Sequence, residues 1–265
     1  MEFLEILQTV AVCLLAGAGA GIGTGFAGMS AAAAITPLLV TFLGLDPYVA
    51  VGIALASDVP ASAVSTITYG KHKNLDIKNG LVMMLAVLCF TVVGSYVSSL
   101  LPSATMGSFS VMMTVLLGVK FILRPVTATK ESMGAQDPRK RFVASLLAGV
   151  LVGFICGFVG AGGGMMMLLV LTSVLGYELK TAVGTSVFIM TFTALTGSLS
   201  HFAIAGLAGE WLPLVLCMLF TLLFARLAAV IANRAKPATL NRAVGIVLVV
   251  IGVLILAVEY LPRWW

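Results

Sequence analysis

The feature that most constrains this chain is a series of apolar runs that covers almost its whole length. The runs fall at residues 6–24, 31–43, 49–69, 80–100, 106–123, 142–159, 164–176, 182–204, 211–231 and 240–260. A helix of about 20 apolar residues crosses the roughly 30 Å hydrocarbon core of a bilayer. Only 9% of the residues are charged, against about 25% in soluble domains. The sequence therefore predicts an all-α integral membrane protein that crosses the lipid bilayer several times.

The two halves of the chain are similar to each other. Residues 21–52 align without a gap with residues 153–184, and ten of the 32 aligned pairs are identical, several of them glycines. The polar stretch "RPVTATKESMGAQDPRKR" lies between the halves, and its prolines and mixed charges predict a solvated linker. We therefore divide the chain into a first transmembrane repeat, 1–123, a cytoplasmic linker, 124–141, and a second transmembrane repeat, 142–265.

The distribution of lysine and arginine predicts the orientation, because these residues stay on the cytoplasmic side when they lie in short loops. One topology places all of the 15 basic residues except Arg263 inside, with both the N- and C-termini outside. In this topology loop 70–79 is inside, whereas its counterpart in the second repeat, around 203–210, is outside. The two repeats are then inverted relative to each other, an arrangement typical of secondary transporters.

Two of the apolar runs are too short to span a membrane. Segments 31–43 and 164–176 have 13 residues each, and a helix of that length rises about 20 Å. They follow the glycine-rich stretches "GIGTGFAGMS" and "GFVGAGGG", where glycine permits a tight reversal. Irregular backbone at membrane depth is tolerated when it is buried in protein or lines a watery cavity. We predict that each repeat holds one glycine-tipped helical hairpin, followed by three transmembrane helices.

The hairpin tips are candidate anion sites, because the first N–H groups of a helix have no partner within it and lie at its positive end. The helices that follow the hairpins are rich in hydroxyls, which donate hydrogen bonds without adding charge. Two alternatives stay open: the glycines serve close helix packing, and the hydroxyls bond to carbonyls of their own helix. The candidate substrate-binding residues are Gly25, Gly28, Ser30, Ser62, Ser65, Gly160, Gly162, Gly163, Gly164, Thr185, Ser186, Thr193 and Gly197.

Asp58 is an ionisable residue near the middle of a predicted span. An ionised carboxylate at that depth is costly without a partner, so burial favours its neutral form. Asp58, Ser62 and Ser65 lie on one helical face, since they are separated by four and three residues. Asp58 is therefore the candidate for proton coupling. The alternative is a hydrogen-bonded structural carboxyl beside Pro60.

The paired stretches "GFAGMSAAAAITPLL…LG…AVG" and "GFVGAGGGMMMLLVL…LG…AVGTS" resemble the TauE/SafE sulfite-exporter family, and the resemblance covers essentially the whole chain. It implies a small transporter that moves sulfite, sulfoacetate or a related sulfur-containing anion across the bacterial inner membrane. The first tip departs from the family pattern, because Ser30 replaces a glycine there. The alternatives are an uncoupled anion channel or facilitator and a membrane assembly protein.

Motifs of other functional classes are missing from the sequence. The stretch "GAGGG" lacks the preceding strand and the GK[ST] ending of a nucleotide loop, and there is no HExxH metal motif. We therefore expect no enzyme activity, no cofactor, no metal and no nucleic-acid partner. The sequence leaves a homo-oligomer open.

The predicted orientation can be tested with single cysteines. A cysteine in loop 70–79 should react with a membrane-impermeant thiol reagent only after the inner face is exposed, whereas one near Glu210 should react from outside. Equal labelling of both positions from outside would rule out the inverted topology.

Overall fold

A computed structural model of the chain describes residues 3–99, 115–116, 118–134, 137–159, 163–205 and 210–260. Within these ranges the regular secondary structure is helical, as predicted. The helices are α1 Phe3–Ala27, α2 Ala32–Leu43, α3 Pro47–Lys71, α4 Ile77–Ser99, α6 Lys130–Gly134, α7 Pro138–Val159, α8 Gly163–Ser173, α9 Leu179–Ala205, α10 Trp211–Arg234 and α11 Pro237–Tyr260.

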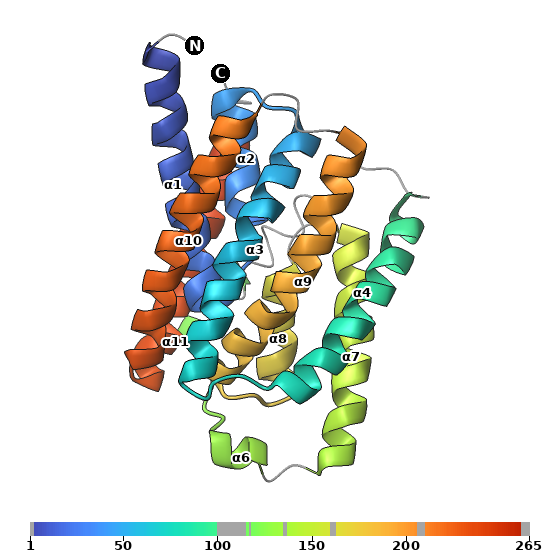
Figure 1. Cartoon of the computed structure of the whole chain (residues 1–265). Helices are drawn as coiled ribbons and strands as arrows, with labels where there is room; N and C mark the ends of the chain where they lie inside the picture. The colour runs from blue at the N-terminus through green and yellow to red at the C-terminus, as the bar shows by residue number, and fades with distance from the viewer. Residues whose placement is uncertain are drawn as a thin grey trace.

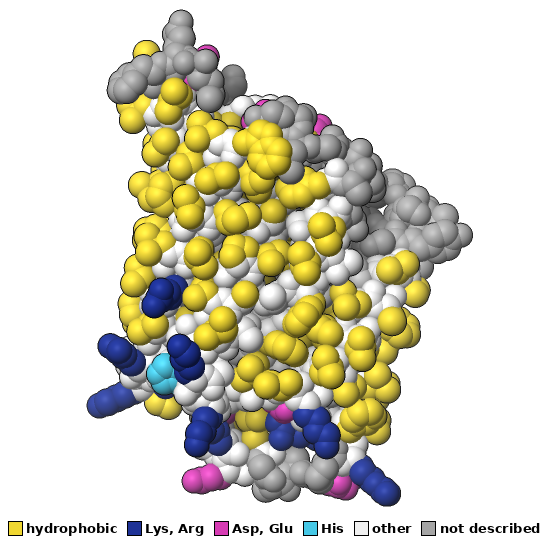
Figure 2. All heavy atoms as spheres, viewed as in Figure 1, with side chains coloured by type: hydrophobic (Ala, Val, Ile, Leu, Met, Phe, Trp, Pro, Cys, Tyr) yellow, Lys and Arg dark blue, Asp and Glu magenta, His cyan; other side chains and the backbone are white. Residues whose placement is uncertain are grey.

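Five of the described helices are long and apolar enough to cross a bilayer. They cover Leu4–Ala27, Val49–Lys71, Leu179–Leu199, Trp211–Arg234 and Pro237–Leu254. Figure 2 shows apolar side chains over the flank of the molecule, with lysines and arginines gathered toward the end that carries α6 in Figure 1. The chain is therefore a multi-pass membrane protein. The two short helices predicted near the glycines are also present, as α2 with 12 residues and α8 with 11.

The helices of the two halves interlock. Helix α1 packs along α10, and α4 packs along α7, so that each of these pairs joins the first half to the second. Helices α3 and α9 pack against each other between these pairs (Figure 1). The core of the molecule is therefore built from both halves together.

Glycines set the distance between the paired helices. Gly17, Gly21 and Gly25 of α1 face α10, and Gly149 and Gly153 of α7 face α4. A Cβ atom at Gly21 would lie 2.6 Å from the carbonyl oxygen of Thr221 and 2.7 Å from the amide nitrogen of Ala225. Small residues allow such backbones to approach closely. The packing alternative left open by the sequence therefore applies to the Gly17–Gly25 series.

Most of the described residues of the stretch 124–141 are exposed, but the stretch is anchored to the protein at several points. Helix α7 begins at Pro138, and Met133 of α6 is only 7% exposed. The Val126 N–H donates to Asn241 Oδ1 at 2.8 Å, and Lys130 Nζ donates to the Lys73 carbonyl at 3.0 Å. The stretch is held against the protein because these groups find partners in both halves, on α11 and in the connection between α3 and α4.

The close approach of α1 and α10 can be tested with two alanine substitutions on one helix. Gly21→Ala should lower the free energy of unfolding by about 1–3 kcal/mol, because the added methyl group meets backbone atoms that cannot turn aside. Gly19→Ala is the control, since its Cβ would lie 4.0 Å from Ala34 Cβ. Thermal unfolding of the purified protein in detergent should show a lower Tm for Gly21→Ala alone. Equal Tm values would contradict the packing.

Candidate functional site

The first hairpin reverses direction at a glycine in a left-handed conformation. Helix α1 ends at Ala27, and Gly28 follows with a φ of +61°, a region that favours glycine. The Gly28 N–H donates to the Thr24 carbonyl at 2.9 Å, and the Met29 N–H donates to the Gly23 carbonyl at 3.2 Å. These bonds satisfy carbonyls at the end of the helix. The predicted hairpin is therefore present in the first half.

The second hairpin is described on both sides of its tip. Helix α7 ends at Val159 and α8 begins at Gly163. Gly160 and Gly162 lie outside the described residues, so their predicted role stays a prediction. A Cβ atom at Gly164 would collide with the Gly28 carbonyl oxygen and would lie 3.0 Å from the Ser30 amide nitrogen. The start of α8 therefore lies directly against the first tip.

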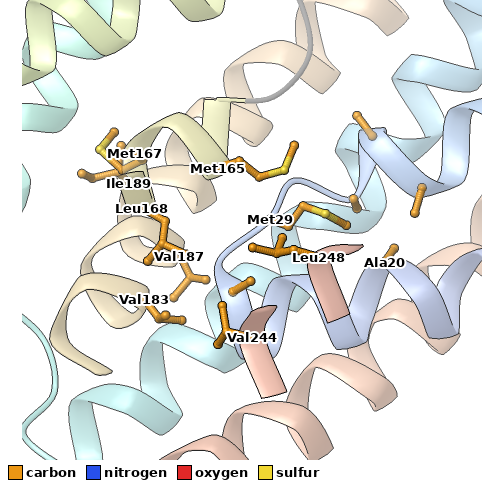
Figure 3. Close-up of a cluster of buried hydrophobic side chains, with 14 of the residues drawn as sticks. Ala20, Met29, Met165, Met167, Leu168, Val183, Val187, Ile189, Val244 and Leu248 are labelled. Carbon is orange, nitrogen blue, oxygen red and sulfur yellow. The ribbon is translucent and has the colours of Figure 1, made fainter. Parts of the chain in front are cut away.

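Side chains from both halves surround this contact. A Cβ atom at Gly28 would collide with the Ser186 hydroxyl of α9. Met29 of the first tip and Met165 of α8 belong to one buried apolar cluster, which Figure 3 shows. The structure thus brings together four of the predicted site residues: Gly28, Ser30, Gly164 and Ser186.

Asp58 lies at the first tip and is 1% exposed. The Ala31 N–H donates to its Oδ2 atom at 3.1 Å, and the Ser62 hydroxyl donates to its Oδ1 atom at 2.9 Å. The hydroxyls of Thr24 and Ser30 also interact with this carboxyl group. Asp58 therefore takes up donors, at the start of α2, that the sequence analysis assigned to a bound anion.

The two tips have different charges, because among the described residues only the first lies against a carboxyl group. At the offset of 132 between the repeats, the counterpart of Asp58 is Met190, and a Cβ atom at Gly164 would lie 2.5 Å from its sulfur. The second tip therefore has a thioether where the first has a carboxylate. An incoming anion would be repelled less at the start of α8 than at the start of α2.

The face of α3 that continues from Asp58 toward its C-terminal end also packs against this hairpin. Tyr69 Oη donates to the Gly25 carbonyl at 2.9 Å. Ser65, between Ser62 and Tyr69 on this face, is fully buried, and its hydroxyl has no hydrogen-bond partner within the described part of the chain. Buried hydroxyls are usually paired, so Ser65 is available to a ligand or a water molecule.

The hydroxyl of Ser186 and those of other predicted site residues already have hydrogen-bond partners within the protein. Thr185 Oγ1 accepts the Asp76 N–H at 3.2 Å, and Ser186 Oγ donates to the Val183 carbonyl at 2.9 Å. Thr193 donates to the Met190 carbonyl at 3.2 Å, which is the self-bonding alternative. A Cβ atom at Gly25 would meet α10, and one at Gly197 would lie 3.0 Å from Leu55 Cδ1. We therefore leave Gly25, Thr193 and Gly197 out of the site.

The sequence analysis missed a polar cluster at the end that carries α6. Arg141 Nη2 donates to Asp76 Oδ2 at 2.6 Å, and Tyr177 Oη donates to the same oxygen at 2.8 Å. Burial and the Asp76 carboxylate raise the pKa of Tyr177 to about 12. Asp76 also caps α4, since it accepts the Asn79 N–H at 3.2 Å. This D-x-x-N capping pattern was the signal in the sequence, but it carries no information about Arg141.

A metal site is not evident in the part of the chain that is described. No three side chains of His, Cys, Asp or Glu converge there. The groups gathered at the tips are backbone amides, hydroxyls and one carboxyl group. Such a set can bind an oxyanion through neutral donors and can bind or release a proton.

Known proteins resemble the chain over most of its length. The profile of the family described as "Sulfite exporter TauE/SafE" matches residues 13–255. The probable membrane transporter protein YunE of Bacillus subtilis is 26% identical, over 95% of this chain and 96% of that protein. The probable membrane transporter protein MJ0441 of Methanocaldococcus jannaschii is 26% identical, over 89% of this chain and 88% of that protein. No solved structure matches.

The contact between the tips can be tested at Gly164. Gly164→Ala should weaken anion binding and lower the Tm, because a methyl group there meets the Gly28 carbonyl and the Ser30 amide. Gly70→Ala is the control, since its Cβ would lie 3.5 Å from the flexible Leu75 side chain. Sulfite binding by calorimetry and thermal unfolding would measure both effects. A Gly164→Ala protein that behaves like Gly70→Ala would show that the tips do not meet in this way.

Proposed function

The chain belongs to the TauE/SafE sulfite exporter family, and we propose that it moves a small sulfur-containing anion across the cell membrane by alternating access. The family and the relatives make it a membrane transporter. The family description names sulfite. The wider substrate class that we propose, which adds sulfoacetate and related organosulfonates or sulfur oxyanions, comes from the resemblance seen in the sequence. The observation that carries the proposal is the meeting of the two hairpin tips inside the protein, where amides, hydroxyls and the Asp58 carboxyl group gather.

We include the inverted repeat in this proposal, with the division into 1–123, 124–141 and 142–265. Its support is that the same pairing occurs twice: α1 packs on α10, and their counterparts in the alignment, α7 and α4, also pack together. Glycines make the close contact in both pairs. Two pseudo-symmetric halves can exchange conformations, which gives access to a central site from either side of the membrane.

The substrate site that we propose centres on the second tip. It includes the backbone from Gly162 to Gly164, together with Ser30 and Ser65. Amides at the start of α8 can approach an oxyanion closely because glycines lack side chains. Hydroxyls add donors at no cost of a buried positive charge. The bound anion is thus surrounded by neutral donors, and Asp58 lies opposite it at the first tip.

Asp58 links anion binding to proton binding in this arrangement. The Asp58 carboxyl group of α3 is buried against the first tip, while the proposed anion lies on the second. Two negative charges at this depth repel strongly, because little solvent screens them. Protonated Asp58 removes the repulsion, so that the proton and the anion bind together and cross together.

Counterflow tests whether the protein is a carrier. Proteoliposomes preloaded with unlabelled sulfite should transiently accumulate external radiolabelled sulfite against its own gradient, which a carrier produces and an open channel does not. Absence of sulfite uptake by the wild-type protein, with sulfoacetate also inactive, would remove the proposed substrate class.

Asp58→Asn tests the coupling in the same proteoliposomes. The variant should keep exchange of sulfite, since Asn retains an acceptor for the Ala31 N–H, but it should lose accumulation driven by a pH gradient. Asp137→Asn is the matched control, because Asp137 is exposed and caps α7 through the Arg139 N–H at 3.0 Å. Continued pH-driven accumulation by Asp58→Asn would show that Asp58 is not the coupling residue.

A further inference from the structure

The guanidinium group of Arg141 is held in a fixed orientation at the end of the molecule that carries α6. Its central carbon lies 4.8 Å from the centroid of the Tyr177 ring, and its Nη2 atom donates to Asp76. Tyr177 is fully buried. A stacked and ion-paired guanidinium loses little freedom when it binds another group, because its plane is already set.

One donor of this guanidinium is unused. Arg141 Nε is buried and has no hydrogen-bond partner among the described atoms. Ser145, one turn further along α7, is fully buried, and its hydroxyl also has no partner among these atoms. Residues separated by four positions lie on the same face of a helix. Two donors without acceptors therefore lie one turn apart on one face of α7.

Ser145 shares this lack of a partner with Thr36, Ser65 and Thr221 among the described residues, whereas several other helical hydroxyls of the chain are paired. The hydroxyls of Thr66, Thr68 and Thr91 donate to the carbonyl four residues earlier, at 2.7–2.8 Å. Ser145 has the same option with the Arg141 carbonyl and does not use it. A buried donor without a partner is costly, so native proteins pair most of them with protein, water or ligand. The donors at Arg141 and Ser145 point to an acceptor from outside the chain.

We propose that Arg141 and Ser145 form a second anion subsite, at the inner face, for the anion that the protein transports. An oxyanion has several acceptor oxygens and can take the Nε–H and the Ser145 O–H together, with a charge-assisted bond to the guanidinium. The two donors are buried, but they adjoin a partly exposed ion pair, because the side chains of Arg141 and Asp76 are 17% and 15% exposed. The identity of the anion rests on the proposed function, whereas the subsite rests on these donors.

A chain of contacts connects the subsite to the hairpin tips. Asp76, which shares the guanidinium, donates its N–H to Thr185, and the next residue, Ser186, contacts Gly28 at the first tip. An anion on Arg141 competes with Asp76 for the guanidinium and weakens the ion pair that joins α7 to the residues before α4. Anion binding at the subsite can therefore influence the contacts at the first tip.

Calorimetric titration of the purified full-length protein with sodium sulfite tests the subsite, with sodium chloride of equal ionic strength as the reference. Ser145→Ala should weaken one class of sulfite sites about tenfold, the effect of losing a hydrogen bond to a charged group. Arg141→Lys should weaken the same class, because Lys has no Nε–H fork. In the absence of sulfite, Ser145→Ala should raise the Tm, since it removes an unpaired hydroxyl.

Ser198→Ala is the matched control, because Ser198 is also buried and its hydroxyl donates to the Leu195 carbonyl at 3.0 Å. It should leave sulfite affinity unchanged and should not raise the Tm. Sulfite affinity that is unchanged in both Ser145→Ala and Arg141→Lys would overturn the subsite, as would a wild-type protein that binds no sulfite. Sulfite binding that depends on Ser145, without sulfite transport in proteoliposomes, would support the subsite and refute the proposed function.

Discussion

A backbone that reverses direction inside a membrane exposes polar groups that lipid cannot satisfy, and this constraint explains the surroundings of the first hairpin. The amides of Gly28 and Met29 donate hydrogen bonds to carbonyls of α1. The Thr24 hydroxyl donates to the Met29 carbonyl at 2.8 Å. Helix α3 supplies the remainder, since Asp58 accepts the Ala31 amide and Tyr69 donates to the Gly25 carbonyl. The position of α3 beside the hairpin follows from these needs.

The buried carboxyl group of Asp58 and the partly exposed one of Asp76 have different partners, and the degree of burial accounts for the difference. Asp58, inside the membrane, is surrounded by an amide and hydroxyls. Asp76, at the end that carries α6, is paired with Arg141. Burying a full ion pair removes two charges from water and costs more than its Coulomb energy in many sites. Near the aqueous edge that cost is smaller, so Asp76 can pair with an arginine there. At the centre of the protein, neutral donors stabilise Asp58 instead.

Much of the fold could be predicted because its signals are local. The lengths of the apolar runs gave α2 and α8 as short helices, and the glycines marked the first reversal. The spacing of Asp58 and Ser62 placed them on one face, and they are hydrogen-bonded. The burial of Met133 could not be predicted, and neither could the packing of Gly25 against α10. Both depend on residues far away in the sequence.

The candidate site shows the same division between local and distant signals. The sequence placed Gly28, Ser30, Gly164 and Ser186 in one site, and the structure brings them together. The sequence did not reveal that Asp58 accepts a hydrogen bond from the Ala31 N–H, since 27 residues separate the two groups. Nor could it reveal unpaired donors such as Ser145 Oγ, because a missing partner is a property of packing in three dimensions.

The partners of the first tip also bear on how the chain is made. Thr24, Asp58 and Tyr69 all belong to the half that the ribosome completes first, and they satisfy this tip without help from later residues. The second tip instead comes to rest on the carbonyl of Gly28 and the amide of Ser30. Chains fold from the N-terminus during synthesis. The first hairpin can therefore form in the bilayer before the second half is made, and α8 and α9 then dock onto it.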